Sequence, residues 1–175
     1  MSDLTHVPVM ELLRASLDPA SHRTDVVSKL DLPTGRLIAA AAHADADDKG
    51  ADRLANLAGG LALAALGLTA ELASRGDKTL DEFLDGLKQA SDGEVYTLLV
   101  ETLRGMLHDQ SVEIMGRTLA QDQALFLDLL LVLASYCGTS ILALQAIGTP
   151  AETTLNDLED ALRDAGDEAE PAATS

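Results

Sequence analysis

Two stretches without a charged side chain dominate the sequence: LANLAGGLALAALGLTA at residues 54–70 and LLLVLASYCGTSILALQAI at residues 129–147. Their lengths approach the roughly 20 residues that an α-helix needs to cross a bilayer. The first is rich in Ala and Gly, so its transfer into lipid would gain little, and Asp128 before the second would cost roughly 3 kcal/mol there. We therefore expect a buried central helix pair, and we keep a membrane-active helical hairpin as the alternative.

Apolar residues recur at helical spacing on both sides of these stretches, and no alternating strand pattern is convincing. Leu (33) and Ala (28), both strong helix formers, make up about a third of the 175 residues. We predict an all-α, single-domain helical bundle of about six to eight helices over residues 1–166, with two long apolar central helices and a disordered acidic tail at 167–175. The segment 111–119 is either a separate helix or an extension of the one before it. The predicted helical segments are 9–17, 21–31, 36–48, 51–74, 80–87, 95–107, 111–119, 122–147 and 150–165.

Capping signals place several helix ends. Thr79 with Glu82, and Ser91 with Glu94, have the spacing of a capping box, in which each side chain binds the other residue's backbone N–H. Gly76 is placed to end the helix 51–74 in a left-handed conformation. Pro150 suits the first turn of the last helix.

The charge excludes one class of partner. Twelve Lys and Arg against 29 Asp and Glu give a net charge of −17, which repels phosphate backbones and argues against direct nucleic-acid binding. The same charge allows a different function, that of an acidic nucleic-acid mimic that inhibits a DNA-binding enzyme. The single cysteine, Cys137, lies among apolar residues, and the N-terminus lacks the pattern of a secretory signal, so we expect a reduced thiol and a cytoplasmic protein.

We find no motif that specifies a reaction, a cofactor or a metal. Residues 45–50, DADDKG, begin like a calcium-binding loop, but Lys49 and Asn56 occupy its fifth and twelfth positions, where oxygen ligands are required. The four histidines are scattered, and Cys137 has no acid–base partner nearby in the sequence. We therefore expect a protein that is not an enzyme and that holds no cofactor or metal.

Two faces could meet a partner. Gly60, Ala64 and Gly67 form part of a strip of small residues on one long helix, which allows close approach of another backbone. Leu155, Leu158 and Leu162 form an apolar seam on the last helix. Each face could pack within its own chain or against another. A third feature is the polar line Gln121, Asp128, Ser135 and Thr139 on the second long helix. It faces solvent or the polar groups of a neighbouring helix, or else a lumen or polar network in an assembly.

From these features we expect a non-enzymatic helical protein that acts through protein–protein interaction, in a regulatory or scaffold role. A self-associating homodimer is the expected form, because the central helices need more cover than the short helices provide.

Overall fold

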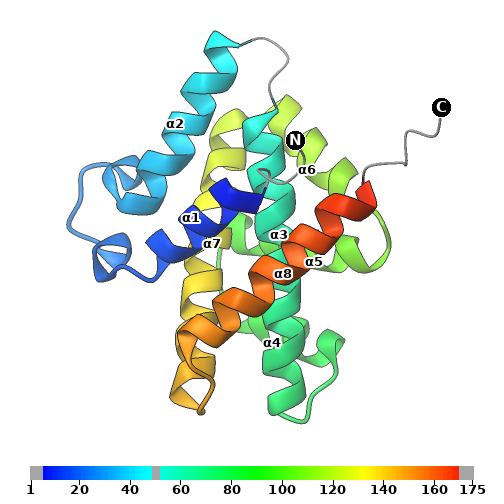
Figure 1. The fold of residues 1–175 in the computed structure, drawn as a ribbon. Coiled ribbons are helices and arrows are strands. Elements are labelled where there is room, and N and C mark those ends of the chain that lie inside the picture. Colours follow the sequence, from blue (N-terminus) through cyan, green and yellow to red (C-terminus); the bar gives the residue numbers. More distant parts are fainter. Residues whose placement is uncertain (1–5, 49–51, 170–175) are drawn as a thin grey trace, which may run out of the picture.

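The computed structural model describes residues 6–48 and 52–169, and every α-helix in these ranges belongs to one bundle (Figure 1). No strand occurs among the described residues, so the predicted all-α class is confirmed. Two 3-10 helices lie between the first two α-helices. In chain order, the elements are α1 (His6–Ser16), η2 (Pro19–His22), η3 (Lys29–Asp31), α2 (Pro33–Asp47), α3 (Arg53–Arg75), α4 (Leu80–Ala90), α5 (Glu94–Leu107), α6 (Ser111–Gln121), α7 (Gln123–Ala146) and α8 (Ala151–Ala169).

The two long apolar helices, α3 and α7, form the centre of the bundle, as predicted. They make the most extensive contact between any two helices, and the other α-helices pack around them. Their facing side chains are fully buried, Leu61 and Leu68 on α3 and Leu133 on α7 among them. Two polar contacts join the pair: a 2.7 Å hydrogen bond between the hydroxyls of Thr69 and Tyr136, and a weaker one at 3.8 Å in which the Cys137 thiol donates to the Leu61 backbone oxygen.

Several helix ends differ from those predicted. Thr79 and Glu82 do form the capping box that begins α4. Ser91 and Glu94 do not, because Gly93 takes a φ of 123° and becomes the N-cap of α5, leaving Ser91 as the C-cap of α4. At the end of α3, the left-handed residue is Asp77 (φ 52°), whereas Gly76 has a φ of −92°. Asp tolerates the left-handed region better than most residues, so a glycine is not required there.

The segment 21–31, predicted as a short helical element, is mostly irregular. It contains part of η2, all of η3 and an extended connection between them. The Ser28 hydroxyl accepts a 3.2 Å hydrogen bond from the Leu30 backbone N–H, a local bond that competes with continuous helix. Val26, Val27 and Leu30, whose spacing suggested a helix face, do not enter the core.

The last helix begins at Ala151 and runs through Ala169, past Gly166, where we expected it to end. One glycine in a helix costs about 1 kcal/mol relative to Ala, which the alanines on either side offset in part. Residues 170–175, the rest of the predicted disordered tail, lie outside the described residues, as do residues 1–5 and 49–51.

Asp45, the first residue of the calcium-like segment, caps the next helix. Its two carboxylate oxygens accept hydrogen bonds of 3.0 Å from the backbone N–H groups of Arg53 and Leu54, at the first turn of α3. A carboxylate suits this place, because the N-terminus of a helix carries a partial positive charge and unpaired N–H donors. Asp45 therefore joins the end of α2 to the start of α3.

Candidate functional site

Residues 22–32, which we call the arm, leave α1 and return to α2 along the side of the bundle (Figure 1). Hydrogen bonds fix the arm at its base. The His22 ring nitrogen Nε2 lies 2.7 Å from the Ser16 backbone oxygen, and the Ser21 hydroxyl donates to the Ala15 backbone oxygen at 2.6 Å. The arm therefore starts from a defined position at the end of α1.

Two glycines allow the close contacts that place the arm. A Cβ at Gly138 of α7 would lie 2.5 Å from the Ser16 backbone oxygen, and one at Gly35 of α2 would collide with the Lys29 backbone oxygen. Only a residue without a side chain fits at either position. His22, at the start of the arm, contacts Ser16, which packs against α7. Lys29, toward the other end of the arm, packs against α2.

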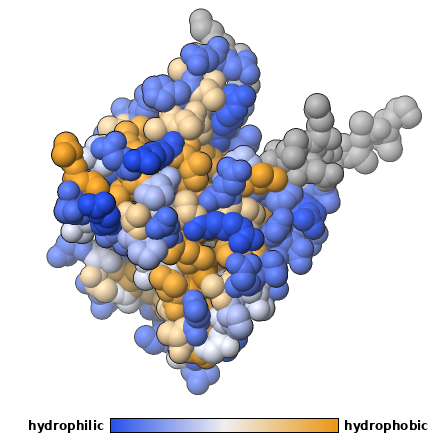
Figure 2. All heavy atoms as spheres, turned by 60° about the vertical axis from the view of Figure 1, so that its left-hand side comes forward, coloured by the Kyte–Doolittle hydropathy of each residue, from blue (hydrophilic) through white to orange (hydrophobic). Residues whose placement is uncertain are grey.

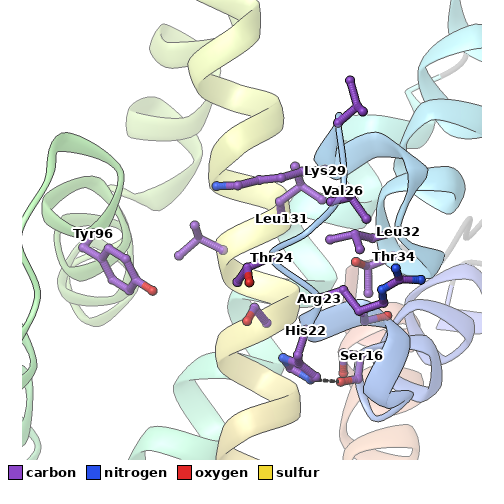
Figure 3. A pocket seen from close by; sticks show the side chains of 14 residues that line it. Ser16, His22, Arg23, Thr24, Val26, Lys29, Leu32, Thr34, Tyr96 and Leu131 are labelled. Carbon is purple, nitrogen blue, oxygen red and sulfur yellow. Dashed lines mark hydrogen bonds between the residues drawn. The ribbon is translucent and has the colours of Figure 1, made fainter.

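An open cleft of about 510 Å³ lies between the arm, α5 and α7. Leu131, Val132 and Ser135 of α7 form its floor. In Figure 3, the Lys29 side chain extends from the arm toward α7, and Tyr96 approaches from α5 on the opposite side. We call this hollow the arm cleft. Its mixture of apolar floor and a few polar groups is typical of sites that bind a ligand or a peptide segment.

Basic side chains line the arm cleft in a strongly acidic chain. His22, Arg23 and Lys29 line it, and no Asp or Glu does so within the described residues. Arg23 is already paired, since its guanidinium donates to both carboxylate oxygens of Asp25 at 2.9 and 2.7 Å. That pairing holds the pKa of the Asp25 carboxyl below its usual value. Lys29 takes part in no ion pair among the described side chains, so its charge is free to meet another group.

Apolar side chains are exposed around the same cleft. Val27 at the tip of the arm is 105% exposed, Leu30 is 37% exposed and Tyr96 is 38% exposed. Figure 2, in which the side of the molecule that carries the arm comes forward, shows hydrophobic side chains emerging among hydrophilic ones. A valine this exposed gains nothing from the fold of its own chain.

The structure places the two predicted partner faces against each other and against α1. A Cβ at Gly60 would lie 2.5 Å from a methyl of Val9 on α1, and one at Gly67 would lie 3.9 Å from a methyl of Leu158 on α8. Ala64 is buried. Leu155, Leu158 and Leu162 are buried in the core of the same chain. An open groove nevertheless remains between α3 and α8, over Gly67, and we call it the α3–α8 groove.

The polar line predicted on α7 faces outward. Asp128, Ser135 and Thr139 are all exposed, and Ser135 forms part of the floor of the arm cleft. The sequence did not reveal this cleft. Its residues come from α1, the arm, α5 and α7, which lie far apart in the sequence, so no pattern of neighbouring residues indicates that they meet.

The described part of the chain holds no other cluster of reactive or metal-binding side chains. No three His, Cys, Asp or Glu side chains gather there in a way that could hold a metal ion. Cys137 is fully buried, and burial raises the pKa of its thiol to about 12. By length and composition, α3 and α7 could each cross a membrane. In this bundle, about half of the most apolar 18-residue stretch of each helix is buried.

No protein-family model, curated protein or solved structure matches this chain.

Proposed function

We propose that the protein is a non-enzymatic helical interaction protein, which binds an acidic, partly apolar segment of another polypeptide in the arm cleft. The composition of the cleft lining carries this proposal. In a chain with a net charge of −17, the lining holds the unpaired Lys29, the Arg23 that is paired with Asp25, the imidazole of His22 and the apolar Leu131 and Val132, and no carboxylate from the described residues is part of it. Such a lining is complementary to carboxylates alternating with apolar side chains.

The energetics support a role for the exposed apolar residues. Burying a valine side chain fully against a partner gains roughly 1.5–3 kcal/mol, and Val27 has its whole side chain available. Leu30 and Tyr96 are also partly exposed and add apolar area. Lys29 at the edge of the cleft contributes mainly to the rate of association and to the choice of partner, because exposed charge pairs add little affinity.

The acidity of the rest of the molecule does not prevent an acidic partner from binding. At physiological ionic strength the Debye length is about 8 Å, so carboxylates farther than this from the partner are largely screened. The charged side chains within that distance decide the local interaction: Lys29 is unpaired there, whereas Arg23 and the adjacent Asp25 offset each other. Binding is therefore expected to weaken as the salt concentration rises.

Photo-crosslinking tests the proposal. A photoreactive phenylalanine analogue replaces Val27 in the full chain, in the cells that produce it, and Val112 on α6 serves as the matched control because its side chain is also exposed, at 79%. We expect a discrete crosslinked species from position 27 and not from position 112. The substitution Lys29→Glu should reduce that species, whereas Lys88→Glu on α4 should not. Equal labelling at both positions, or no product at 27, would refute the proposal.

The mass of the crosslinked species identifies the class of partner. A product of twice the subunit mass would show that the second polypeptide is another copy of this chain, as the predicted homodimer requires. Light scattering of the purified protein over a range of concentrations measures the same association without a crosslink. A heavier or lighter product would instead indicate a different protein, which mass spectrometry identifies.

A membrane-active hairpin remains the second candidate, favoured by the length and composition of α3 and α7. The exposed polar side chains of α7, Asp128, Ser135 and Thr139, argue against lipid contact on that face. Fractionation of cells without detergent separates the two candidates. Recovery in the membrane pellet, resistant to a salt wash, would favour the hairpin.

A further inference from the structure

The tip of the arm, residues 24–28, has backbone groups that its own fold leaves unpaired. Figure 1 shows the chain between α1 and α2 looping out at the left side of the bundle. No backbone N–H or C=O of residues 24–27 takes part in a backbone–backbone hydrogen bond within the described structure. Arg23 and Ser28, on either side, have extended backbones, with ψ angles of 139° and 136°. The tip therefore offers backbone donors and acceptors to another chain, as an unpaired edge strand does.

The charges of this segment are arranged symmetrically about Val27. Asp25 lies two residues before Val27, and Lys29 lies two residues after it. Two copies of an extended segment that meet across a two-fold axis run antiparallel, so residue 27 meets its own counterpart and residue 25 meets residue 29 of the other copy. Alternate residues of an extended chain share one face, so all three contacts would lie on the same face of the pair. The segment is therefore complementary to itself in charge.

Both charged groups are available for such a contact. Lys29 is exposed and forms no ion pair among the described side chains. Asp25 is exposed as well, and it accepts hydrogen bonds from Arg23 at 2.9 and 2.7 Å. Because each carboxylate oxygen can accept more than one hydrogen bond, Asp25 can meet the lysine of a second copy without releasing Arg23.

The arm is also electrically balanced. Residues 22–32 hold two basic side chains, Arg23 and Lys29, and two acidic ones, Asp25 and Asp31, whereas the whole chain has a net charge of −17. Two copies of an acidic protein repel each other. A contact through the arm adds no further like-charge repulsion, so this segment suits self-association better than the acidic helices do.

We propose that the arms of two copies of this chain pair antiparallel about a two-fold axis at Val27. This inference rests on the proposed function, because it names the acidic, partly apolar segment that binds: Asp25, Val26 and Val27 of a second copy. Thr24, Val26, Val27 and Lys29 line the arm cleft, so a second arm paired with them lies along its edge. Val27, 105% exposed in one chain, is then covered by its own counterpart. The segment is short and must straighten at its bends, so the dimer is of the weak, concentration-dependent class.

Exchanging the two charges tests the pairing, with sedimentation equilibrium of the full chain over a range of concentrations. Asp25→Lys places lysine at both positions and Lys29→Asp places aspartate at both, so each variant alone should dimerise at least about tenfold more weakly. An equimolar mixture of the two variants again opposes lysine and aspartate at both contacts. We expect the mixture to form a heterodimer with a dissociation constant within about threefold of the original.

Two controls match these changes in net charge. Asp47→Lys on α2 and Lys88→Asp on α4, both at exposed positions, should each leave the dissociation constant within about twofold of the original. Circular dichroism checks that every variant is folded. A protein that stays monomeric over the whole range, or a mixture that associates no better than its two components, would overturn the proposed pairing.

A cysteine at position 27 locates the two-fold axis. The chain's one cysteine, Cys137, is fully buried, so Val27→Cys introduces an accessible thiol. Directly opposite residues of an antiparallel pair bring their Cβ atoms to about 4.5–5.5 Å, close to the separation in a disulfide. Oxidation with diamide should therefore link Val27→Cys into a covalent dimer at least about tenfold faster than Val112→Cys, whose position is also exposed. Equal rates at the two positions would place the axis elsewhere and overturn the inference.

The photo-crosslink at position 27 separates a failure of this inference from a failure of the proposed function. A crosslinked species of a mass other than twice that of the subunit would overturn the pairing of arms, while the proposed function would stand with a different partner. No crosslinked species at position 27 would overturn both.

Discussion

Replacing Thr154 by valine should stabilise the folded protein, although the same change at most buried threonines destabilises. Valine has nearly the same shape and is also branched at Cβ, so the side-chain conformation and the helix propensity change little. The variant removes a hydroxyl that is buried without a partner, whose cost is about 1–3 kcal/mol. It also adds a buried methyl group, worth about 0.8 kcal/mol. After allowance for local adjustment, we expect the free energy of unfolding to rise by about 1–2 kcal/mol.

Thr102→Val is the matched control. Thr102 is fully buried on α5, and its hydroxyl donates to the Leu98 backbone oxygen at 2.7 Å. Losing that bond should lower the free energy of unfolding by about 1 kcal/mol, so the two variants should change stability in opposite directions.

Urea unfolding followed by circular dichroism measures both changes, provided that the slope m is the same in each variant. In thermal unfolding, a change of 1 kcal/mol should correspond to about 2–4 °C for a chain of this size. If Thr154→Val destabilises as much as Thr102→Val, the Thr154 hydroxyl has a hydrogen-bond partner in solution, and the reasoning fails.

Three further results are expected. Asp45→Ala removes the acceptor for two backbone N–H groups at the start of α3 and should lower the free energy of unfolding by about 0.5–2 kcal/mol, whereas Asp47→Ala, at an exposed position, should have little effect. Gly138→Ala forces a Cβ against the end of α1 and should destabilise the fold by about 1–3 kcal/mol. Gly116→Ala, with open space around it, should stabilise the fold by up to about 1 kcal/mol. Urea titrations of each variant and its control measure these changes. Because burial raises the pKa of Cys137 from 9.0 to about 12, the thiol keeps its proton in the folded state at pH values where the unfolded chain loses it. The contribution of this thiol to the free energy of unfolding should therefore be full below pH 9 and be lost as the pH rises toward 12. Unfolding curves across this pH range measure the dependence, which should be smaller in Cys137→Ala.

The long helices were predictable because their signals are local. The uncharged runs at 54–70 and 129–147 placed α3 and α7 to within a few residues at each end, and the capping box at Thr79 and Glu82 placed α4. These signals depend on neighbouring residues in one helix. The errors arose where two local rules competed, as at Ser91, where the left-handed Gly93 took the position of the cap.

The candidate sites depend on contacts that no local pattern encodes. The small-residue strip and the leucine seam were both recognised, but only the fold shows that Gly67 lies beside Leu158. The arm cleft was missed because Lys29 and Tyr96 lie far apart in the sequence and approach each other across α7 (Figure 3). The spacing of Val26, Val27 and Leu30 indicated a helix face, whereas the side-chain bond of Ser28 and the two short turns leave these residues outside the core.

The hydrogen bond between Thr69 and Tyr136 has a consequence for how α3 and α7 are aligned along their axes. Leucine and alanine recur so often on both helices that a shift of one turn, about 5.4 Å, would still bring apolar side chains together. Such a shift would separate the two hydroxyls, which are 2.7 Å apart, and deprive the fully buried Thr69 of this partner. One polar pair inside an apolar interface can in this way favour a single register, which leucine and alanine alone would specify poorly.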